Sequence, residues 1–410
     1  MMLIELDLTI SQILEMYPET REVFITNGFP QFADKEIQRD LGTVLKLKTA
    51  LKSKNLNVDA FIKLLEGKIH EVRQYSKLSS SVVTKGKCLD LLALLPCPLK
   101  VPLQGELQLV LNQMRLEKSL DLHYTIDTSA NKYIHYEEYI PYFEDPDEVP
   151  DIILTTGYEF LHEKFVERFV KNGIFLQATG QQVNSRFTSA QLLDPQGHFF
   201  VLAVNALVMV VEKKRLGSLP VPRTWSDLLN PVFENQVVMR GHGDIFCDAL
   251  QLYYYKDYGN DGITGLARAV RYGLHPAQMV KELNGSRNGL PPIYIMPRFF
   301  AETLNGHKNI EIIWPSDGAL VYPVSLLVKA SKAVELKKLV DYLTGAQAAR
   351  VFDEAFFPSS HLQGGRSLAE SASFKWVGWD YIRSCGIERL QQELNDRFLD
   401  AWRGGSSACS

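Results

Sequence analysis

The pattern of apolar and polar positions divides the chain into a helical start and a long region of alternating strands and helices. In the first 70 residues, apolar side chains recur at helical spacing, as at Ile10, Ile13 and Leu14. Thr9 and Gln12 stand where a capping box would begin this helix. We therefore expect an all-α unit over residues 1–70, followed by a polar, serine-rich linker over residues 71–87.

Continuous apolar runs after the linker predict strands that are buried on both faces. Such runs occur within residues 89–95, 151–154 and 236–239, where Asp90, Asp151 and Gln236 are the only polar residues, and helical patterns separate them. The run from 199 to 211 is longer, and we interpret it as a pair of strands interrupted at Asn205. Strands that alternate with helices are typical of a doubly wound α/β fold.

Two stretches in the second half carry a family resemblance. The first is TWSDLLNPVF, residues 224–233, which precedes a predicted strand. The second is a strand over residues 320–326, then a predicted helix over 333–343 and the sequence Thr344-Gly345-Ala346-Gln347. Together they resemble the solute-binding proteins of ABC importers, in the class that includes ferric-ion, putrescine and thiamine binders.

This resemblance spans about residues 87–402 and implies a two-lobed, type 2 periplasmic-binding-protein-like fold. The expected first lobe comprises residues 88–204 and 318–403, and the expected second lobe comprises residues 205–317. In this interpretation the chain crosses between the lobes near Asn205 and returns along the strand that contains Tyr322.

The N-terminal unit resembles a small helical domain of unknown function that occurs in some redox proteins of anaerobes. That family usually has a Cys-x-x-Cys pair at the glycine turn, but here the turn is Gly28-Phe29-Pro30-Gln31-Phe32. The missing pair argues against a thiol redox or metal role. Contact with a protein partner, dimerisation, and a simple packed cap remain open alternatives.

Composition and charge narrow the compartment and the partners. A net charge of -4 gives no reason to expect nucleic acid or an anionic membrane. The first residues have no basic stretch before an apolar one, and the five cysteines are scattered and odd in number. These observations predict a cytoplasmic protein with free thiols, whereas the family resemblance implies export.

Candidate ligand contacts follow from the rule that open α/β sheets bind ligands beyond the carboxyl ends of their strands. Thr155, Thr156 and Gly157 come after one predicted strand and before a helix, where hydroxyls and amides suit a carboxylate or oxyanion. Cys97 follows the first strand. We interpret it as a ligand contact whose thiol, beside a helix N-terminus, would have a lowered pKa and could bind a soft metal, with a buried structural cysteine as the alternative.

In the second lobe, Gly241, His242 and Asp244 follow a strand, and we expect polar ligand contacts there. A metal site at His242, Asp244 and Cys247 is a weaker alternative. Asp244 is also a candidate helix N-cap.

Arg298 stands where the ferric-binding relatives have two adjacent tyrosines, so we expect it to hold an anionic ligand and its removal to leave the fold intact. Tyr322 is the candidate contact nearest the hinge. The triplet at residues 253–255 belongs to a predicted helix, which argues against iron binding by a tyrosine pair.

The leading functional hypothesis is an ABC-type solute-binding protein for a small polar or anionic ligand, with a metal-containing ligand left open. Its partners would be the solute and an ABC permease, and no cofactor is expected. The alternative is a cytosolic sensor or carrier that uses the same cleft, with the helical unit contacting a partner protein. An enzyme is not favoured, since no Ser-His-Asp order, phosphate-binding loop or zinc spacing occurs.

Overall fold

The structure of the protein is a computed structural model, and its two compact units, Met1–Lys87 and Cys88–Ser410, are described separately. The described residues are 4–29, 32, 45–54, 56–58, 61–69, 90–118, 122, 124–128, 140, 143, 146, 149–177, 181–285, 289–365 and 367–406. The expected linker at 71–87 and the cysteines at 88 and 409 lie outside them.

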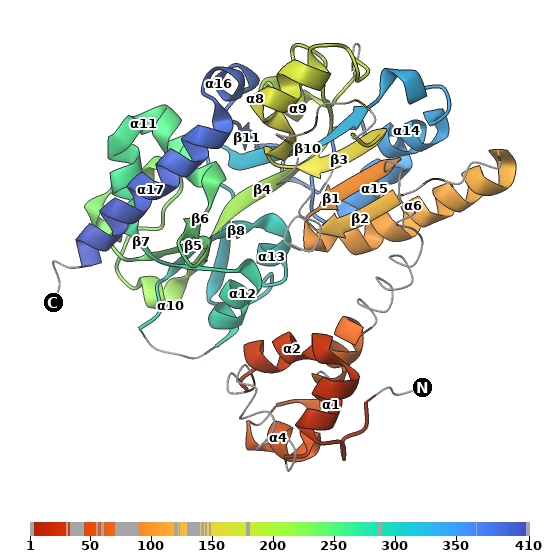
Figure 1. The fold of residues 1–410 in the computed structure, drawn as a ribbon. Coiled ribbons are helices and arrows are strands. Elements are labelled where there is room, and N and C mark those ends of the chain that lie inside the picture. Colours follow the sequence, from red (N-terminus) through yellow and green to blue (C-terminus); the bar gives the residue numbers. More distant parts are fainter. Residues whose placement is uncertain are drawn as a thin grey trace. The chain divides into compact units, whose positions relative to one another are not determined.

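The first unit is helical, as predicted. Its elements are α1 (Ile10–Met16), η1 (Pro18–Thr20), α2 (Arg21–Thr26), α4 (Leu47–Ser53) and a helix over residues 61–69 (Figure 1). The capping box is confirmed, because the Thr9 hydroxyl accepts from the Gln12 amide while the Gln12 side chain accepts from the Thr9 amide. The rings of Phe24, Phe29 and Phe61 pack against one another in its core.

The second unit is built on one mixed sheet, in which the described residues form eleven strands. The main path is β2 (Tyr124–Thr128), β1 (Leu91–Leu95), β3 (Ile152–Thr156), β10 (Ala319–Val328), β4 (Phe200–Glu212), β8 (Ile293–Pro297), β5 (Val237–His242) and β6 (Ile245–Phe246). Beside this path, β7 (Val270–Leu274) pairs with β5, β9 (Ile310–Ile313) with β4, and β11 (Phe374–Lys375) with β10.

The sheet has two halves, and we call the half around β1, β2 and β3 the first lobe and the half around β5, β7 and β8 the second lobe. Each half contains parallel strands: β1 runs parallel to β2 and β3, and β5 runs parallel to β7 and β8. Every residue of β1 and β3 is buried, as their continuous apolar character predicted. The expected α/β architecture of two lobes, with a helical first unit, is confirmed.

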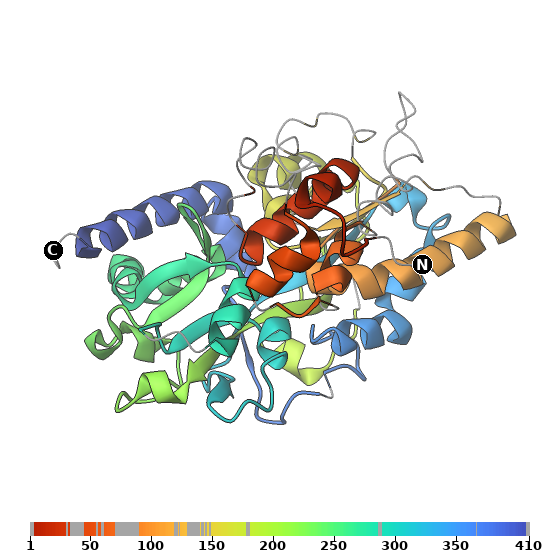
Figure 2. The same ribbon diagram turned by 90° about the horizontal axis from the view of Figure 1, so that it is seen from below.

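Helices cover both faces of the first lobe. One face carries α6 (Cys97–Lys118), α14 (Lys337–Thr344) and α15 (Ala346–Glu354), whose apolar side chains form a cluster with β1 and β3. Figure 2 shows orange α6 beside these blue helices. The other face carries η5 (Glu159–Leu161), α8 (Glu163–Phe165), the π-helix η6 (Val166–Val170), α9 (Ser185–Ser189) and α16 (Trp379–Ser384).

The second lobe is covered by α11 (Asp248–Ala269) on one side and by α12 (Pro276–Asn284) and α13 (Arg298–Glu302) on the other. Short pieces complete it: α10 (Lys213–Leu216), η7 (Ser226–Leu229) and η8 (Pro231–Phe233); η9 (Ala330–Lys332) follows β10. The tryptophan motif thus forms 3-10 turns. Trp225 is fully buried there, and its indole N–H donates to the carbonyl of Gly318 at 2.8 Å.

The strand that leaves the first lobe is unbroken, contrary to the expected interruption at Asn205. β4 continues from Phe200 to Glu212 through that residue. The irregularity lies instead in its pairing with β10, whose register shifts between Val324 and Ser325. Such a bulge bends and twists a strand without ending it.

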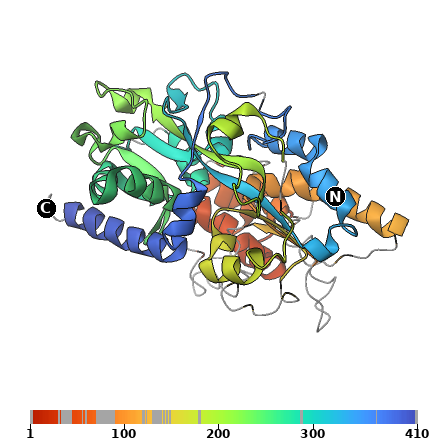
Figure 3. The same cartoon turned by 90° about the horizontal axis from the view of Figure 1, so that it is seen from above.

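The last helix, α17 (Ile387–Ser406), lies along α11, although the sequence assigned residues 318–403 to the first lobe. Figures 1 and 3 show the dark blue helix beside green α11. Phe398 is fully buried and its ring lies 4.7 Å from that of Phe246. The end of the chain is therefore packed on the second lobe.

Candidate functional site

The carboxyl ends of the parallel strands in the two lobes face each other across β4 and β10. Val324 of β10 pairs with both Thr156 of β3 and Ala203 of β4, so the end of β3 is level with Ala203. Pro297, the last residue of β8, pairs with Leu207. Since a strand rises about 3.3 Å per residue, these ends stand about 13 Å apart along β4. This gap is the position at which open α/β sheets bind ligands.

The first-lobe side of the gap contains two buried hydroxyls. Thr155 and Thr156 are 3% and 6% exposed, and neither hydroxyl oxygen has a hydrogen-bond partner among the described residues. Gly157 follows with φ of 112°, a backbone conformation that favours glycine, and the chain turns away from the sheet. A buried polar group without a partner costs about 1–3 kcal/mol, so such groups are rare without a reason.

The two threonines point to opposite faces of the sheet. Ile152 and Leu154 of β3 belong to the cluster under α6, whereas Ile153 belongs to the cluster on the other face. Because side chains alternate along a strand, Thr156 shares the α6 face and Thr155 does not. The structure therefore brings Thr156 and Gly157, but not the Thr155 side chain, to the side of α6.

The first turn of α6 stands beside Thr156. The pairs Leu91–Ile152 and Ala93–Leu154 place Leu95, the last residue of β1, level with Thr156. Cys97, the predicted contact, is the first residue of α6. Sequence reasoning missed Lys100, which lies in this turn and is only 6% exposed. The sequence does contain a signal for its burial, because Lys100 precedes the apolar residues Leu103 and Leu107 at helical spacing.

On the second-lobe side, Arg298 is the first residue of α13 and is 7% exposed. Its Nε donates to Glu302 Oε1 at 2.8 Å, while its terminal nitrogens reach Ser367 only at 3.5 Å. The guanidinium also lies over the rings of Phe356 and Trp314, at 5.4 and 5.9 Å. These contacts make its removal costly to the fold as well, contrary to our expectation from the sequence.

α13 lies on the same side of the crossing strands as α6. Its Phe299 packs against the first-lobe cluster that contains Leu99 and Leu103 of α6. In Figure 1 the arrowheads of β1, β2 and β3 point toward the second lobe, where α13 begins. The start of α6, Thr156, Gly157 and Arg298 therefore lie on one side of the crossing strands.

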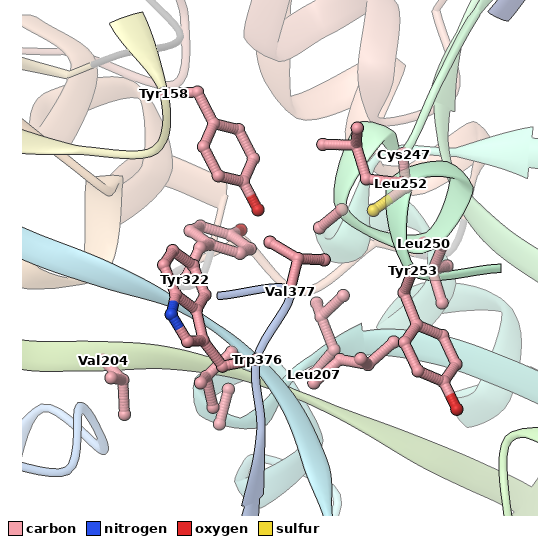
Figure 4. Close-up of a cluster of buried hydrophobic side chains, with 14 of the residues drawn as sticks. Tyr158, Val204, Leu207, Cys247, Leu250, Leu252, Tyr253, Tyr322, Trp376 and Val377 are labelled. Carbon is pink, nitrogen blue, oxygen red and sulfur yellow. The ribbon is translucent and has the colours of Figure 1, made fainter. Parts of the chain in front are cut away.

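Tyr322 lies level with this gap but on the opposite face. It pairs with Asn205 in the ladder, and the Asn205 amide donates to its hydroxyl at 2.8 Å. Figure 4 shows Tyr322 in an apolar cluster with Tyr158 and Trp376, and the Tyr158 hydroxyl points toward it. The rings of Tyr158 and Trp376 stack with centroids 6.4 Å apart. Tyr322 thus belongs to the packed side of the hinge.

The predicted loop at Gly241, His242 and Asp244 differs most from expectation. A short hairpin of β5 and β6 replaces the expected helix start, and α11 begins only at Asp248. Asp244 is exposed and forms an ion pair with Arg403 of α17 at 2.7 Å, so the N-cap interpretation is wrong. His242 is the last residue of β5.

Gly241 is needed for close packing of strands. A Cβ at Gly241 would lie 2.9 Å from the Cα of Gly273 on the neighbouring strand β7. The close backbone approach predicted from this glycine is thus an approach to β7.

The residues considered for metal binding, His242, Asp244 and Cys247, lie in and directly after the hairpin of β5 and β6. The described residues contain no group of three or more histidine, cysteine, aspartate or glutamate side chains suited to a metal ion. Burial raises the pKa of the Cys247 thiol to about 11, which disfavours a thiolate ligand. Tyr253 and Tyr254 are buried in α11, and the Tyr254 hydroxyl donates to the carbonyl of Trp225 at 2.6 Å.

Two surface depressions lie at the ends of β4, away from the gap. One, of about 390 Å³, is lined by Leu202, Ser360 and the turn at Gly345. The other, of about 690 Å³, is lined by Glu212, Arg215 and Lys308. Neither includes any of the predicted contacts.

Three solved structures share the fold of the second unit. The Trichodesmium IdiA (FutA) protein in complex with iron and citrate ligands has a TM-score of 0.54 and 14% identity over 77% of this chain and 99% of its own. A two-component system protein described as mediating signal transduction has a TM-score of 0.53 and 14% identity over 75% of this chain and 100% of its own. A putative spermidine/putrescine ABC transporter from Listeria monocytogenes has a TM-score of 0.50 and 11% identity over 76% of this chain and 99% of its own.

Sequence comparison gives the family. No curated protein matches the chain. A domain of unknown function, DUF1858, matches residues 4–62. Within the described residues, none of the helices combines the length and the apolar character of a membrane span. The family description is extracellular, so it does not support the expected cytoplasmic location. Because the model of the bacterial extracellular solute-binding proteins matches residues 147–385, more than half of the chain, this protein belongs to that family.

Proposed function

We propose that the protein is the solute-binding component of an ABC-type importer and closes its two lobes on a small anionic solute. The observation that carries this proposal is the gap between facing strand ends, with the unbonded Thr156 hydroxyl on one side and Arg298 on the other. The lobes correspond to residues 88–204 and 205–317, with residues 318 to about 384 returning to the first.

The donors around the gap favour an anion. The Arg298 guanidinium has one strong bond, to Glu302, and its terminal N–H groups make only long contacts. The Thr156 hydroxyl adds a donor, and the N-terminal end of α6 favours negative charge. Glu302 is already paired with Arg298. A polyamine, such as the name of the Listeria relative suggests, requires carboxylates that this set of residues does not supply.

Hinge closure explains why contacts come from both lobes. Each lobe alone offers only part of the donor set, so we expect poor binding by either half and tight binding by the closed form. The function is binding rather than catalysis. The partner would be an ABC permease, which this protein would meet on the extracytoplasmic side of the membrane, as the extracellular description of the family suggests.

A second candidate is a ligand sensor that uses the same gap, with the helical unit contacting a partner protein. It is favoured by the similarity of the second unit to a two-component system protein. Genes for a permease and an ATPase beside this one would favour transport. Capture of a signalling protein by the helical unit alone would favour sensing.

Native mass spectrometry of the full chain purified from its own host tests the proposal. We expect a bound small anion that Thr156→Ala and Arg298→Ala both weaken, the second by about 2–5 kcal/mol if it pairs with a buried charge. Both variants must first be shown to fold by circular dichroism. Unchanged affinity in two folded variants, or a bound polyamine, would contradict the proposal.

A further inference from the structure

We propose that Lys100 is a second cationic contact and that the solute is a small dianion with one charged group toward each lobe. This inference rests on the proposed function and adds to it a residue and a substrate class.

The position of Lys100 on α6 is unusual for a lysine. Leu103, Leu107, Leu111 and Met114 follow it at spacings of three and four residues, and all are buried against the sheet. Lys100 therefore lies in the centre of the core-facing stripe. The outer face of the helix is well exposed, as Leu109 and Leu116 show.

The strand register places this lysine at the gap. Leu95 ends β1 level with Thr156, and Pro96 separates it from the first residue of α6. The carbonyl of Pro96 accepts from the amide of Lys100 at 3.1 Å, so Lys100 belongs to the first turn. The helix packs on the face of the sheet that also carries Thr156.

Charge supports an anionic occupant at this turn. Burying an ammonium is costly unless it is paired, and the N-terminal end of a helix is itself electropositive. Lys100 takes part in an interaction within the protein, so an anionic solute would share this cation rather than supply its only counter-charge. An anion at the first turn of α6 is therefore favoured by both the lysine and the helix.

The second lobe repeats this arrangement. Arg298 stands in the first turn of α13, which follows β8, and the ends of β3 and β8 are about 13 Å apart along β4. One buried cation thus stands on each side of the gap. A monoanion can contact only one of them at short range, whereas a dianion of suitable length can contact both.

The experiment compares three four-carbon probes on the full chain: succinate, butyrate and putrescine, with malonate and glutarate to vary length. Binding is measured by isothermal titration and by the shift of Tm. We expect a dicarboxylate to bind best and putrescine not at all. Lys100→Met should weaken dicarboxylate binding at least about tenfold and butyrate binding much less, since only one end of the solute loses its partner.

Two control variants separate binding from folding. Lys329 is another buried lysine of the first lobe, paired with Asp151 at 2.9 Å at the opposite end of β3. Lys329→Met should lower Tm but leave the dissociation constants unchanged. Thr155→Val removes an unbonded hydroxyl on the other face and should also leave binding unchanged. Lys100→Arg should retain most of the affinity. If Lys100→Met does not fold, Lys100→Gln takes its place as the variant expected to lose affinity.

The outcomes distinguish the two proposals. Equal dicarboxylate affinity in the wild type and in a folded Lys100→Met variant overturns the role of Lys100 while leaving solute binding intact. A neutral, cationic or singly charged solute that co-purifies from the host overturns the dianion. If no probe binds and no solute co-purifies, the proposed function itself fails, and this inference with it.

Discussion

Thr156 shows at the scale of one residue how a site can be distinguished from a core position. Its hydroxyl is buried and has no hydrogen-bond partner in the described part of the chain, so removing it from the empty protein should not cost the stability that a bonded hydroxyl provides. Thr156→Val should leave the free energy of unfolding unchanged or raise it, because the shape is kept and an unpaired polar group is lost. The measurement is chemical denaturation of the full chain.

Ser360 provides the matched control for this prediction. Ser360 is 5% exposed, and its hydroxyl donates to the carbonyl of Val201 at 2.7 Å. Ser360→Ala should therefore lower the free energy of unfolding by about 1 kcal/mol. If Thr156→Val destabilises the protein as much as Ser360→Ala does, the Thr156 hydroxyl has a structural partner and our interpretation of it is wrong.

At the scale of elements, the approach of β5 to β7 depends on two glycines. A Cβ at Gly241 would meet the Cα of Gly273 at 2.9 Å and Phe246 at 3.1 Å. Gly241→Ala should therefore push the strands apart and lower the free energy of unfolding by about 1–3 kcal/mol, as overpacking does. Thermal unfolding measures this.

Gly285 of the same lobe serves for comparison, since a Cβ there meets only carbonyl oxygens at 3.5 Å. Gly285→Ala should be tolerated. A Gly241→Ala variant with unchanged Tm would show that β5 and β7 have room to separate.

The loop from Ser359 to Gly365 is held by one carboxylate, which gives a second prediction for an element. Asp353 accepts from the Ser359 and Gly365 amides at 2.8 and 2.9 Å. Burial raises its pKa above the usual 3.8, against the opposing effects of these amides, Arg298 and His361. A raised pKa means that the folded protein binds the proton more tightly, so this contribution to stability is complete below pH 3.8 and is lost as pH rises through the folded pKa.

Asp353→Asn removes this titration while keeping an oxygen that accepts from the amides. The wild type should therefore lose stability relative to Asp353→Asn as pH rises from below 3.8 through the folded pKa. Tm recorded against pH for the two proteins tests this. Parallel curves would mean that the pKa of Asp353 is the same in the folded and unfolded chains.

The sequence predicted elements whose cause is local. Continuous apolar runs gave β1 and β3, and the capping box at Thr9 gave the start of α1. It did not predict the unbroken β4 or the hairpin before α11, because both depend on partners distant in the chain. The same holds for the site. Strand ends were found from pattern, but the opposite faces of Thr155 and Thr156 and the burial of Lys100 follow only from packing.

At the scale of the whole second unit, α17 connects the two lobes. Near its start, Glu388 pairs with His162 of the first lobe, and near its end, Arg403 pairs with Asp244 of the second. Phe398→Ala should cost about 3–5 kcal/mol, because this ring is fully buried against Phe246. Limited proteolysis of the Phe398→Ala variant at increasing denaturant concentration should show that the second lobe unfolds first.

Glu388→Gln provides the comparison at the other end of the helix. The Glu388 side chain is 62% exposed, so losing this pair should cost no more than about 1 kcal/mol. Equal losses in Phe398→Ala and Glu388→Gln would mean that α17 is not anchored mainly on the second lobe.

The position of Arg298 between Phe356 and Trp314 also gives the protein a built-in optical reporter. Trp314 belongs to the second lobe, its indole N–H donates to Ser373, and the guanidinium lies 5.9 Å from its ring. Trp225 and Trp379 are nearly fully buried, so their emission should respond little to a hinge motion. Any rotation that separates Arg298 from the 356–373 segment changes the surroundings of Trp314. Because Trp376 of the hinge cluster also emits, opening and closing are followed as the difference in stopped-flow fluorescence between the unlabelled chain and a Trp314→Phe variant.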